Sequence, residues 1–236
     1  MSEGPSPAST TDGGAPSFGT ANPRVLHIVF VVDCSGSMTG ERIGSLNWAA
    51  RAAVPAMRDA AAEHPDVDVL VRVLRFADEV DWPVASAVPV DRFVWTTLTA
   101  GGESRMGAAL SALAATLKEL EGEAAQHLPP VIILLSDGLP TDDASEGVAT
   151  LAASELGAKS VRIPIAIGPD ADLDLLQAFS GDPSLKPLRA NSAEMLVGRI
   201  RWATSVPVEA SVGGAAVRMP ADAAGEENEA HGGLLW

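Results

Sequence analysis

Three oxygen-bearing side chains follow the first apolar segment of the chain. Asp33, Ser35 and Ser37 form the pattern Asp-x-Ser-x-Ser directly after the apolar residues 26–32. One carboxylate and two hydroxyls on a tight turn are hard donors that suit a small divalent cation such as Mg²⁺, and Gly36 allows the turn to close. Ser35 or Ser37 could equally be the N-cap of a following helix. A metal site therefore needs further ligands elsewhere in the chain.

Two later segments offer such ligands. The apolar run 131–135 has the length of a strand and ends in Ser-Asp-Gly, with Asp137 as the acid, so it repeats the layout around Asp33. A glycine-rich loop that contains Ser104 enters an Ala- and Leu-rich helix. In an open parallel sheet, ligands bind outside the carboxyl ends of the strands. We therefore expect Asp33 and Asp137 to lie together at that edge, with Ser104 as a further candidate ligand.

The rest of the body predicts an α/β fold. Apolar runs of strand length alternate with amphipathic stretches, which favours a parallel sheet between layers of helices. Only three residues separate the second and third strands, so these two are expected to form a hairpin. We expect a doubly wound, mostly parallel six-stranded sheet with one antiparallel edge strand and helices on both faces. The predicted strands are 25–32, 67–76, 80–85, 131–135, 161–167 and 185–189, and the predicted helices are 41–63, 104–121, 145–156, 173–179 and 193–204.

The two ends of the chain differ from this body in composition. Residues 1–23 are rich in Ser, Thr, Pro, Gly and Ala and are expected to be a disordered N-terminal tail. Residues 24–205 are expected to form one domain, and residues 206–236 a flexible acidic tail that ends in Leu-Leu-Trp236. This tail could dock on a partner or bring a glutamate to the metal. A solvated tail with an incidental apolar end explains the same residues.

The candidate ligands resemble the metal-ion-dependent adhesion site of von Willebrand factor type A (VWA) domains, a Rossmann-like fold. Across residues 24–205 the chain further resembles the bacterial TerY-like branch, which is associated with tellurium resistance. That second resemblance rests on Ser-Gly-Ser-Met-x-Gly-x-x-Ile and on the later Ile-Ala-Ile-Gly-Pro-Asp-Ala-Asp. One departure is a serine where the family usually has threonine, which keeps the hydroxyl. The residues that match the adhesion site in order and spacing are Asp33, Ser35, Ser37, Ser104 and Asp137.

The resemblance implies a function in recognition and no enzymatic activity. The three serine hydroxyls would bind Mg²⁺ directly, with Mn²⁺ or Ca²⁺ as alternatives, and the two aspartates would often act through water. An ion held in this way keeps an open coordination position, which an Asp or Glu of a partner protein can fill. The branch further implies a bacterial stress or tellurite (toxic-anion) resistance pathway, with a protein kinase or phosphatase as the partner.

Two other functions fit the same residues. The first is a structural scaffold with a vestigial metal site, because matching ligands show only that a site can form. The second is metal-dependent phosphoryl transfer with Asp33 as the nucleophile. Against the second, Ser35 stands where such enzymes usually carry another acid, and no lysine lies near the motifs. A phosphate-binding loop is disfavoured because Ala108 replaces the required lysine.

Composition and charge narrow the class of protein. The formal net charge of -15, from 16 basic and 31 acidic residues, argues against a nucleic-acid partner. The N-terminus lacks the features of a secretory signal, and no segment is long and apolar enough to span a bilayer. Cys34 is the only cysteine, which favours a reducing compartment and a cytoplasmic location. We expect Cys34 to be a small buried residue and not a reactive thiol.

The remaining polar and aromatic residues favour structural roles. The four histidines are scattered without ligand spacing, so no zinc site is expected. Asp142 and Asp143 are expected to cap the next helix. Glu103 is the one further acid near the candidate ligands, and we interpret it as a solvated loop residue. Trp48 and Trp95 are expected to be packing groups, with a place at the rim of the site as the alternative for either.

Overall fold

The computed structural model describes residues 24–123, 125–213, 217 and 220. Its strands are β1 (Arg24–Asp33), β2 (Val67–Phe76), β3 (Val80–Pro89), β4 (Gln126–His127), β5 (Val131–Ser136), β6 (Val161–Ile167) and β7 (Leu188–Ala190). Its helices are η1 (Gly36–Met38, one 3-10 turn), α1 (Glu41–Ala62), α2 (Met106–Leu120), α3 (Ala144–Ala153), α4 (Glu155–Lys159), α5 (Leu173–Ser180) and α6 (Ala193–Gly213).

The predicted α/β sheet is confirmed. In the described residues six strands follow the order β3-β2-β1-β5-β6-β7, and the two-residue β4 pairs with the start of β1. Strands β2 and β3 are antiparallel, while β1, β2, β5, β6 and β7 run parallel. From β1 the chain proceeds outward to β2 and β3, then returns to β5 on the other side of β1. This reversal between β1 and β5 creates a switch point at their carboxyl ends.

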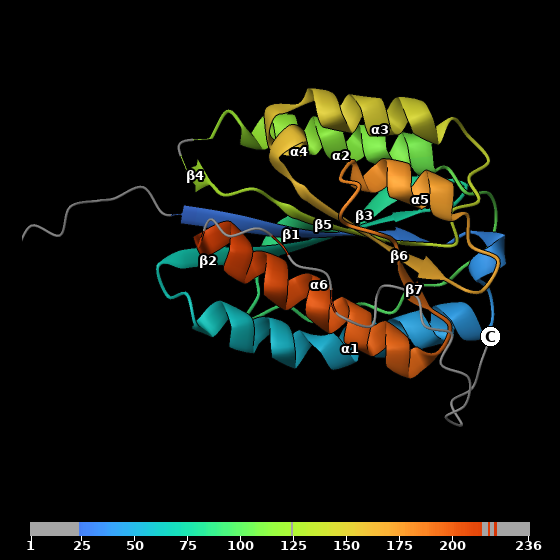
Figure 1. Cartoon of the computed structure of the whole chain (residues 1–236), viewed down its shortest axis with the longest axis horizontal. Helices are drawn as coiled ribbons and strands as arrows, with labels where there is room; N and C mark the ends of the chain where they lie inside the picture. Colours follow the sequence, from blue (N-terminus) through green and yellow to red (C-terminus); the bar gives the residue numbers. More distant parts are fainter. Residues whose placement is uncertain (1–23, 124, 214–216, 218–219, 221–236) are drawn as a thin grey trace, which may run out of the picture.

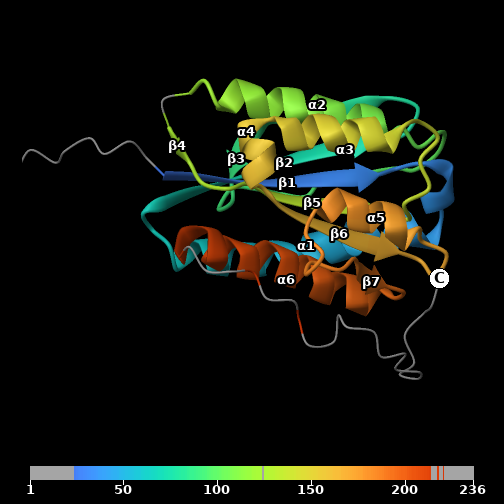
Figure 2. The same cartoon turned by 45° about the horizontal axis from the view of Figure 1, so that its top comes forward.

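Helices cover both faces of the sheet, as Figures 1 and 2 show: α1 and α6 lie on one face, and α2, α3, α4 and α5 lie on the other. A hydrophobic core lies on each face of the sheet, and alternate residues of β1 point into one core or the other. Phe30 and Val32 belong to the core on the α1 side, and Val29 and Val31 to the core on the α2 side. Because both sides of β1 are buried, its sequence is a continuous apolar run and not an alternation of apolar and polar residues.

Several boundaries differ from the predictions. The helix predicted over 145–156 is divided into α3 and α4, because the Ser154 hydroxyl accepts a hydrogen bond from the backbone N–H of Gly157 at 3.1 Å and caps α4. Strand β3 is longer than predicted and β7 is shorter, and β4 was not predicted. Helix α6 was predicted to end at 204 but continues to Gly213.

The predictions about the two ends of the chain fall largely outside the described residues. Positions 1–23 and 221–236 are among those that the structure does not describe. The N-terminal tail and the acidic C-terminal tail therefore stay predictions. The division at residue 205 falls inside the described helix α6, which runs on to Gly213. Among the helices in the described residues, none is both long and apolar enough to cross a membrane.

Candidate metal centre

Asp33 lies at the carboxyl end of β1 with no exposed surface. Its Oδ1 accepts a hydrogen bond from the backbone N–H of Ser35 at 2.9 Å. Its Oδ2 accepts hydrogen bonds from the hydroxyls of Ser136, at 2.6 Å, and Ser104, at 3.3 Å. Both carboxylate oxygens are thus held in place by groups from β5 and two loops, which gives Asp33 one fixed orientation.

Ser35 directly precedes the short turn η1, and Ser37 lies within it. The Ser35 side chain makes no capping hydrogen bond at η1, and α1 begins after Gly40, so the N-cap interpretation of these serines is wrong. Their two Oγ atoms instead lie 3.0 Å apart, with Ser35 buried and Ser37 exposed. A hydroxyl that donates its hydrogen still has lone pairs for a cation. The hydroxyl oxygens of this pair are therefore not used in capping a helix.

The loop before α2 is joined to the β1 turn by two backbone hydrogen bonds. The N–H of Gly101 donates to the carbonyl of Cys34, and the N–H of Gly36 donates to the carbonyl of Gly102, both at 2.8 Å. Gly102 has φ of +85°, a conformation that only glycine adopts readily. These bonds place the two loops in contact along their backbones.

Ser104 is fixed by Thr141, which follows β5. The Ser104 N–H donates to the Thr141 hydroxyl at 3.1 Å, and the Thr141 N–H donates to the Ser104 carbonyl at 2.8 Å. With Ser104 only 3% exposed and bonded to Asp33, the α2 loop, the β1 turn and the β5 loop form one connected unit.

Asp137 completes the centre from the end of β5. It has no exposed surface, and its Oδ1 accepts a hydrogen bond from the N–H of Leu139 at 3.3 Å. Its Oδ2 lies 3.4 Å from Arg42 Nη1, and its carbonyl accepts from the N–H of Asp172 at 2.8 Å. Asp137 is therefore connected to the start of α1 and to the loop before α5.

The electrostatics of the centre favour a cation. Burial raises the pKa of the Asp33 carboxyl, and the nearby Asp137 carboxylate raises it further, against hydrogen bonds from Ser136 and Ser35 that lower it. Within the part of the chain that the structure describes, no Lys, Arg or His lies within ion-pair distance of Asp33. Two buried carboxylates with three hydroxyls are a hard, all-oxygen donor set, which fits Mg²⁺ better than a soft metal.

The structure brings the five predicted ligands to one edge of the sheet, and their role as ligands stays a prediction. The described residues contain no group of three or more His, Cys, Asp or Glu side chains that could hold a metal. The candidate centre differs from such a group, because three of its five candidate ligands are serine hydroxyls and only two are carboxylates.

A family model of the von Willebrand factor type A domain matches residues 27–196. The chain belongs to this family. The match includes β1, the loop before α2 and β5, which are the segments that carry the five candidate ligands. The comparison with curated protein sequences found no significant match.

Several solved structures share the fold of this chain. One is the von Willebrand factor type A protein from Catenulispora acidiphila, with TM-score 0.58, 18% identity and coverage of 80% of this chain and 43% of that one. A second is the pilus adhesin SpaC from Lactobacillus rhamnosus GG, with TM-score 0.58, 16% identity and coverage of 81% and 31%. A third is proximal thread matrix protein 1 from the mussel byssus with a zinc-occupied MIDAS motif, with TM-score 0.52, 18% identity and coverage of 78% and 46%.

These similarities concern the fold. This chain spans less than half of the length of each of the three proteins. At identities of 16 to 18% they show a common architecture and leave the function of this VWA domain to its own residues.

Sequence reasoning missed three residues of the VWA site. Ser136 makes the shorter of the two hydroxyl bonds to Asp33 and precedes a predicted ligand, so its position in Ser-Asp-Gly was an available signal. Thr141 holds Ser104 across 37 positions of sequence, a contact that local patterns do not indicate. Arg42 reaches Asp137 across 95 positions of sequence, and no local pattern could have revealed this contact.

The other sequence predictions near the VWA site have mixed outcomes. Asp143 caps α3, as predicted, through bonds from the N–H groups of Ser145 and Glu146. Asp142 instead caps α2, since its carboxylate accepts from two N–H groups at the start of that helix at 2.9 Å. Glu103 is exposed, as predicted.

Two interior predictions can also be compared with the structure. Trp95 is buried, as expected for a packing group, whereas the Trp48 side chain is 50% exposed and the packing alternative is wrong for it. Cys34 has no exposed surface, and burial raises the pKa of its thiol to about 12. The thiol is therefore un-ionised and enclosed, as expected for an unreactive cysteine.

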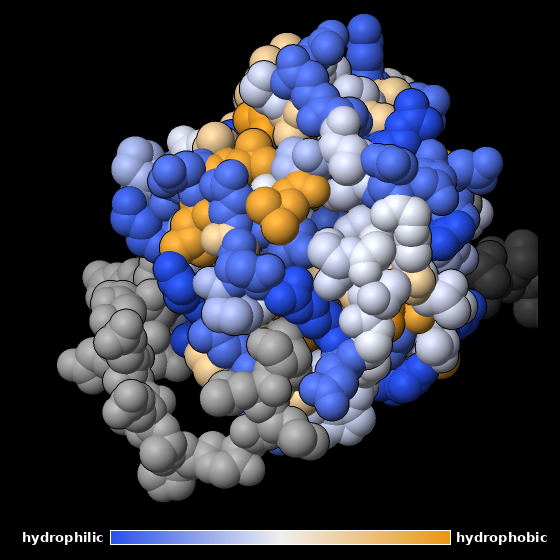
Figure 3. Space-filling model, turned by 90° about the vertical axis from the view of Figure 1, so that its right-hand side faces the viewer, coloured by the Kyte–Doolittle hydropathy of each residue, from blue (hydrophilic) through white to orange (hydrophobic). Residues whose placement is uncertain are grey.

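Figure 3 shows the end of the molecule at which β1 and β5 finish, where hydrophilic residues cover most of the described surface and hydrophobic residues form smaller patches. Leu139, two residues after Asp137, is 46% exposed. The surroundings of the VWA site are therefore mostly polar, with an apolar side chain close to one candidate ligand.

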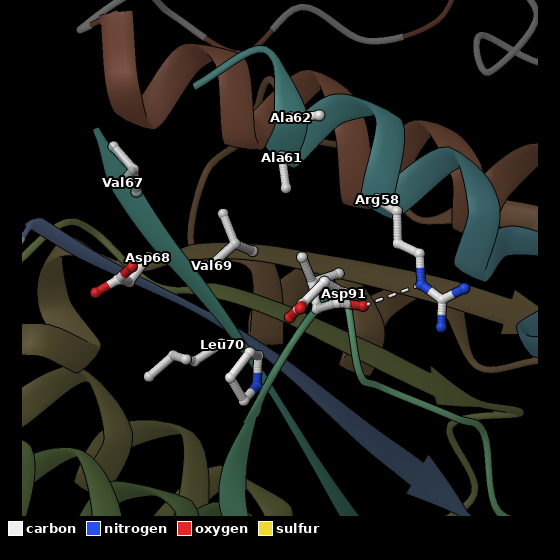
Figure 4. Close-up of a pocket in the computed structure, with 10 residues that line it drawn as sticks. Arg58, Ala61, Ala62, Val67, Asp68, Val69, Leu70 and Asp91 are labelled. Carbon is white, nitrogen blue, oxygen red and sulfur yellow. Dashed lines mark hydrogen bonds between the residues drawn. The ribbon is translucent and has the colours of Figure 1, made fainter. Parts of the chain in front are cut away.

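A separate hollow of about 390 Å³ lies between the end of α1 and the start of β2 (Figure 4). Its one basic side chain, Arg58, donates to the backbone carbonyls of Val90, at 3.2 Å, and Phe93, at 2.8 Å. Val67 is one of the residues that line the hollow. It pairs with Arg24, which lies at the opposite end of β1 from Asp33. The Arg58 guanidinium is thus occupied by hydrogen bonds to the backbone. The hollow itself lies at the end of the sheet away from the candidate metal centre.

Proposed function

We propose that this VWA domain is a Mg²⁺-dependent protein-interaction module that binds an Asp or Glu carboxylate of a partner protein. The observation that carries the proposal is the convergence of two buried aspartates with three serine hydroxyls at the end of the sheet. VWA domains are typically adhesion or interaction modules with such a site, which agrees with this donor set.

Each group at the centre has a distinct task in this proposal. The hydroxyls of Ser35, Ser37 and Ser104 would hold the cation, while Asp33 and Asp137 supply negative charge around it. When bound, a divalent ion whose nearest protein ligands are hydroxyls keeps much of its charge and can accept a carboxylate from another molecule. Asp33 suits an indirect role because both of its oxygens already accept hydrogen bonds.

The donor set supports Mg²⁺, with Mn²⁺ and Ca²⁺ as alternatives, because all of these ions prefer oxygen ligands. The zinc-occupied motif is a property of the mussel byssus protein. For the partner, we propose a protein kinase or phosphatase in a cytoplasmic bacterial pathway of tellurite or toxic-anion resistance. That part of the proposal is supported by the TerY-like sequence motifs alone.

A structural scaffold with a vestigial metal site is the second candidate. The observation in its favour is the ion pair between Arg42 and Asp137, which gives one carboxylate of the centre a cation from the protein itself. We propose no enzymatic role. Phosphoryl transfer by Asp33 would need an accessible carboxylate oxygen, and this side chain is enclosed.

Affinity capture from the lysate of the native host tests the proposed function. Four baits are compared: wild type in Mg²⁺, wild type in chelator, Asp33→Ala in Mg²⁺, and Asp66→Ala in Mg²⁺. Asp66 is a matched control, because it pairs with Arg24 at the start of β1, away from the centre. The proposal expects a protein retained by wild type and Asp66→Ala in Mg²⁺ and absent from the other two. The same proteins on all four baits would favour the scaffold.

A further inference from the structure

Arg42, the second residue of α1, reaches the candidate metal centre from its rim. Its Nη1 lies 3.4 Å from Asp137 Oδ2 and 3.4 Å from the carbonyl of Ser37. Its Nη2 donates to Asp170 Oδ1 at 2.6 Å. The guanidinium thus bridges a carboxylate of the centre and a carboxylate of the loop between β6 and α5.

The two carboxylates differ in their need for this cation. The Asp137 side chain has no exposed surface, whereas that of Asp170 is 59% exposed and that of Arg42 is 16% exposed. A buried carboxylate without a counter-charge is costly, because it has lost its hydration. Among the described residues, Arg42 is the basic side chain within ion-pair distance of the centre's aspartates. It therefore neutralises part of the charge that would attract a metal ion.

The backbone leaves room for this arrangement. Gly168 has φ of +91°, and a Cβ at this position would lie 2.8 Å from Arg42 Nη2 and 3.0 Å from Asp170 Oδ1. A side chain at residue 168 would crowd the bridge between Arg42 and Asp170. The glycine is thus matched to the position of the guanidinium as well as to its own backbone conformation.

We propose that the Arg42 guanidinium competes with the divalent ion for Asp137 and so sets the metal affinity of the centre. This inference rests on the proposed function. A divalent ion beside Asp137 and a guanidinium in contact with the same carboxylate repel each other. Asp170 provides a second anchor, with the shorter of the two contacts, on which Arg42 can stay when its contact with Asp137 is lost. Binding of Mg²⁺ is then an exchange of cations at Asp137.

The test is calorimetric titration of the full chain with Mg²⁺ for wild type, Arg42→Gln and Arg51→Gln. Arg51 is the matched control: it lies on the same helix, its replacement removes the same charge, and its guanidinium contacts Thr97. Arg42→Gln is expected to bind Mg²⁺ roughly tenfold more tightly than Arg51→Gln, as expected when a like charge in direct contact with the site is removed.

Thermal unfolding in chelator separates competition from a merely structural role. Without metal, Arg42→Gln is expected to unfold at a lower temperature than Arg51→Gln, because Asp137 loses its counter-charge. A structural role alone would lower stability without raising Mg²⁺ affinity. Arg42→Lys keeps the charge and is expected to bind Mg²⁺ more weakly than Arg42→Gln. Asp170→Asn frees Arg42 for Asp137 and is expected to weaken Mg²⁺ binding severalfold relative to wild type.

The outcomes distinguish this inference from the proposed function. If wild type binds Mg²⁺ and Arg42→Gln binds it no more tightly than Arg51→Gln, the competition is disproved while the metal centre stands. An unchanged Mg²⁺ affinity in Asp170→Asn would likewise overturn the role of the second anchor. If none of the proteins binds Mg²⁺, both the inference and the proposed function fail.

Discussion

Ser104 depends on two neighbours for its orientation. Thr141 forms hydrogen bonds with both the backbone N–H and the backbone carbonyl of Ser104. The Ser104 hydroxyl donates to Asp33 Oδ2 at 3.3 Å. With only 3% of the residue exposed, the hydroxyl has few other directions available. A serine here can therefore be as well placed as the threonine usual in the family, because neighbouring groups restrict the rotamer that a β-branched side chain would restrict by itself.

Replacement of Ser104 tests this account at the level of one hydroxyl. Ser104→Ala is expected to lower Mg²⁺ affinity by about ten- to a hundredfold, as is typical when a group that supports a metal site is lost. Ser104→Thr keeps the hydroxyl and is expected to bind Mg²⁺ within about threefold of wild type. Calorimetric titration of both variants provides the measurement. Equal affinity in Ser104→Ala and wild type would remove Ser104 from the ligand set.

At the scale of elements, one buried amide fastens α1 to the loop that leads into the centre. Asn47, 4% exposed, accepts hydrogen bonds at Oδ1 from Trp95 Nε1, at 3.0 Å, and from the N–H of Leu98, at 2.8 Å. Its Nδ2 donates to the carbonyls of Leu98 and Ile43, both at 2.8 Å. The amide is fully used, so α1 and the loop position each other.

Asn47→Ala should destabilise the fold by about 2–4 kcal/mol, because the replacement leaves buried donors of Trp95 and Leu98 without partners. Urea unfolding in chelator measures this change. Ser111→Ala is the control, since the Ser111 hydroxyl donates to a carbonyl of its own helix at 2.9 Å, and it should cost less than about 1 kcal/mol. Similar losses of stability in the two variants would contradict the assigned role of Asn47.

The elements that the sequence predicts well are those with local causes. Strand β1 and helix α1 follow from an apolar run buried on both faces and from helical periodicity. The division between α3 and α4 depends on a single cap, and β4 has only two residues, too few for a periodic pattern. The candidate ligands on the β1 turn are neighbours in sequence, so their proximity could be predicted.

Contacts made by the fold could not be predicted in the same way. Ser136 meets Asp33 across 103 positions and Arg42 meets Asp137 across 95, which requires the order of the strands to be known. Asp142 lies beside α3 in sequence but caps α2, because the packing of these two helices brings the start of α2 to it. Partners of this kind depend on tertiary structure, which propensity and periodicity do not contain.

At the scale of the whole molecule, stability should depend on the buried histidine at the other end of the sheet. His27 on β1 is 1% exposed and stacks on His127 with ring centroids 5.4 Å apart. The pKa of His27 is lowered to about 4, mainly by burial and additionally by the charges of Arg72 and His127. The unfolded chain, with an ordinary histidine pKa near 6.5, therefore binds more protons than the folded chain between about pH 6.5 and 4.

The free energy of unfolding is thus expected to fall as pH decreases from about 6.5 to about 4, with His27 accounting for about 3 kcal/mol. Above about pH 6.5 this contribution to stability is fully present. Urea unfolding at a series of pH values measures the effect. His27→Leu should flatten the curve over this range, whereas the control His64→Gln should leave it in place. A slope that is unchanged in His27→Leu would assign the acid sensitivity to other groups.

The most direct measurement of the central claim is titration of the full chain with Mn²⁺, with free Mn²⁺ followed by electron paramagnetic resonance. Wild type is expected to bind one Mn²⁺, Mg²⁺ is expected to displace it, and Asp33→Ala and Asp137→Ala are expected to lose this binding, with Asp66→Ala as the control. Two results would contradict a metal centre built from these residues. One is the absence of saturable Mn²⁺ binding in wild type, and the other is Mn²⁺ binding by Asp33→Ala and Asp137→Ala that equals that of wild type.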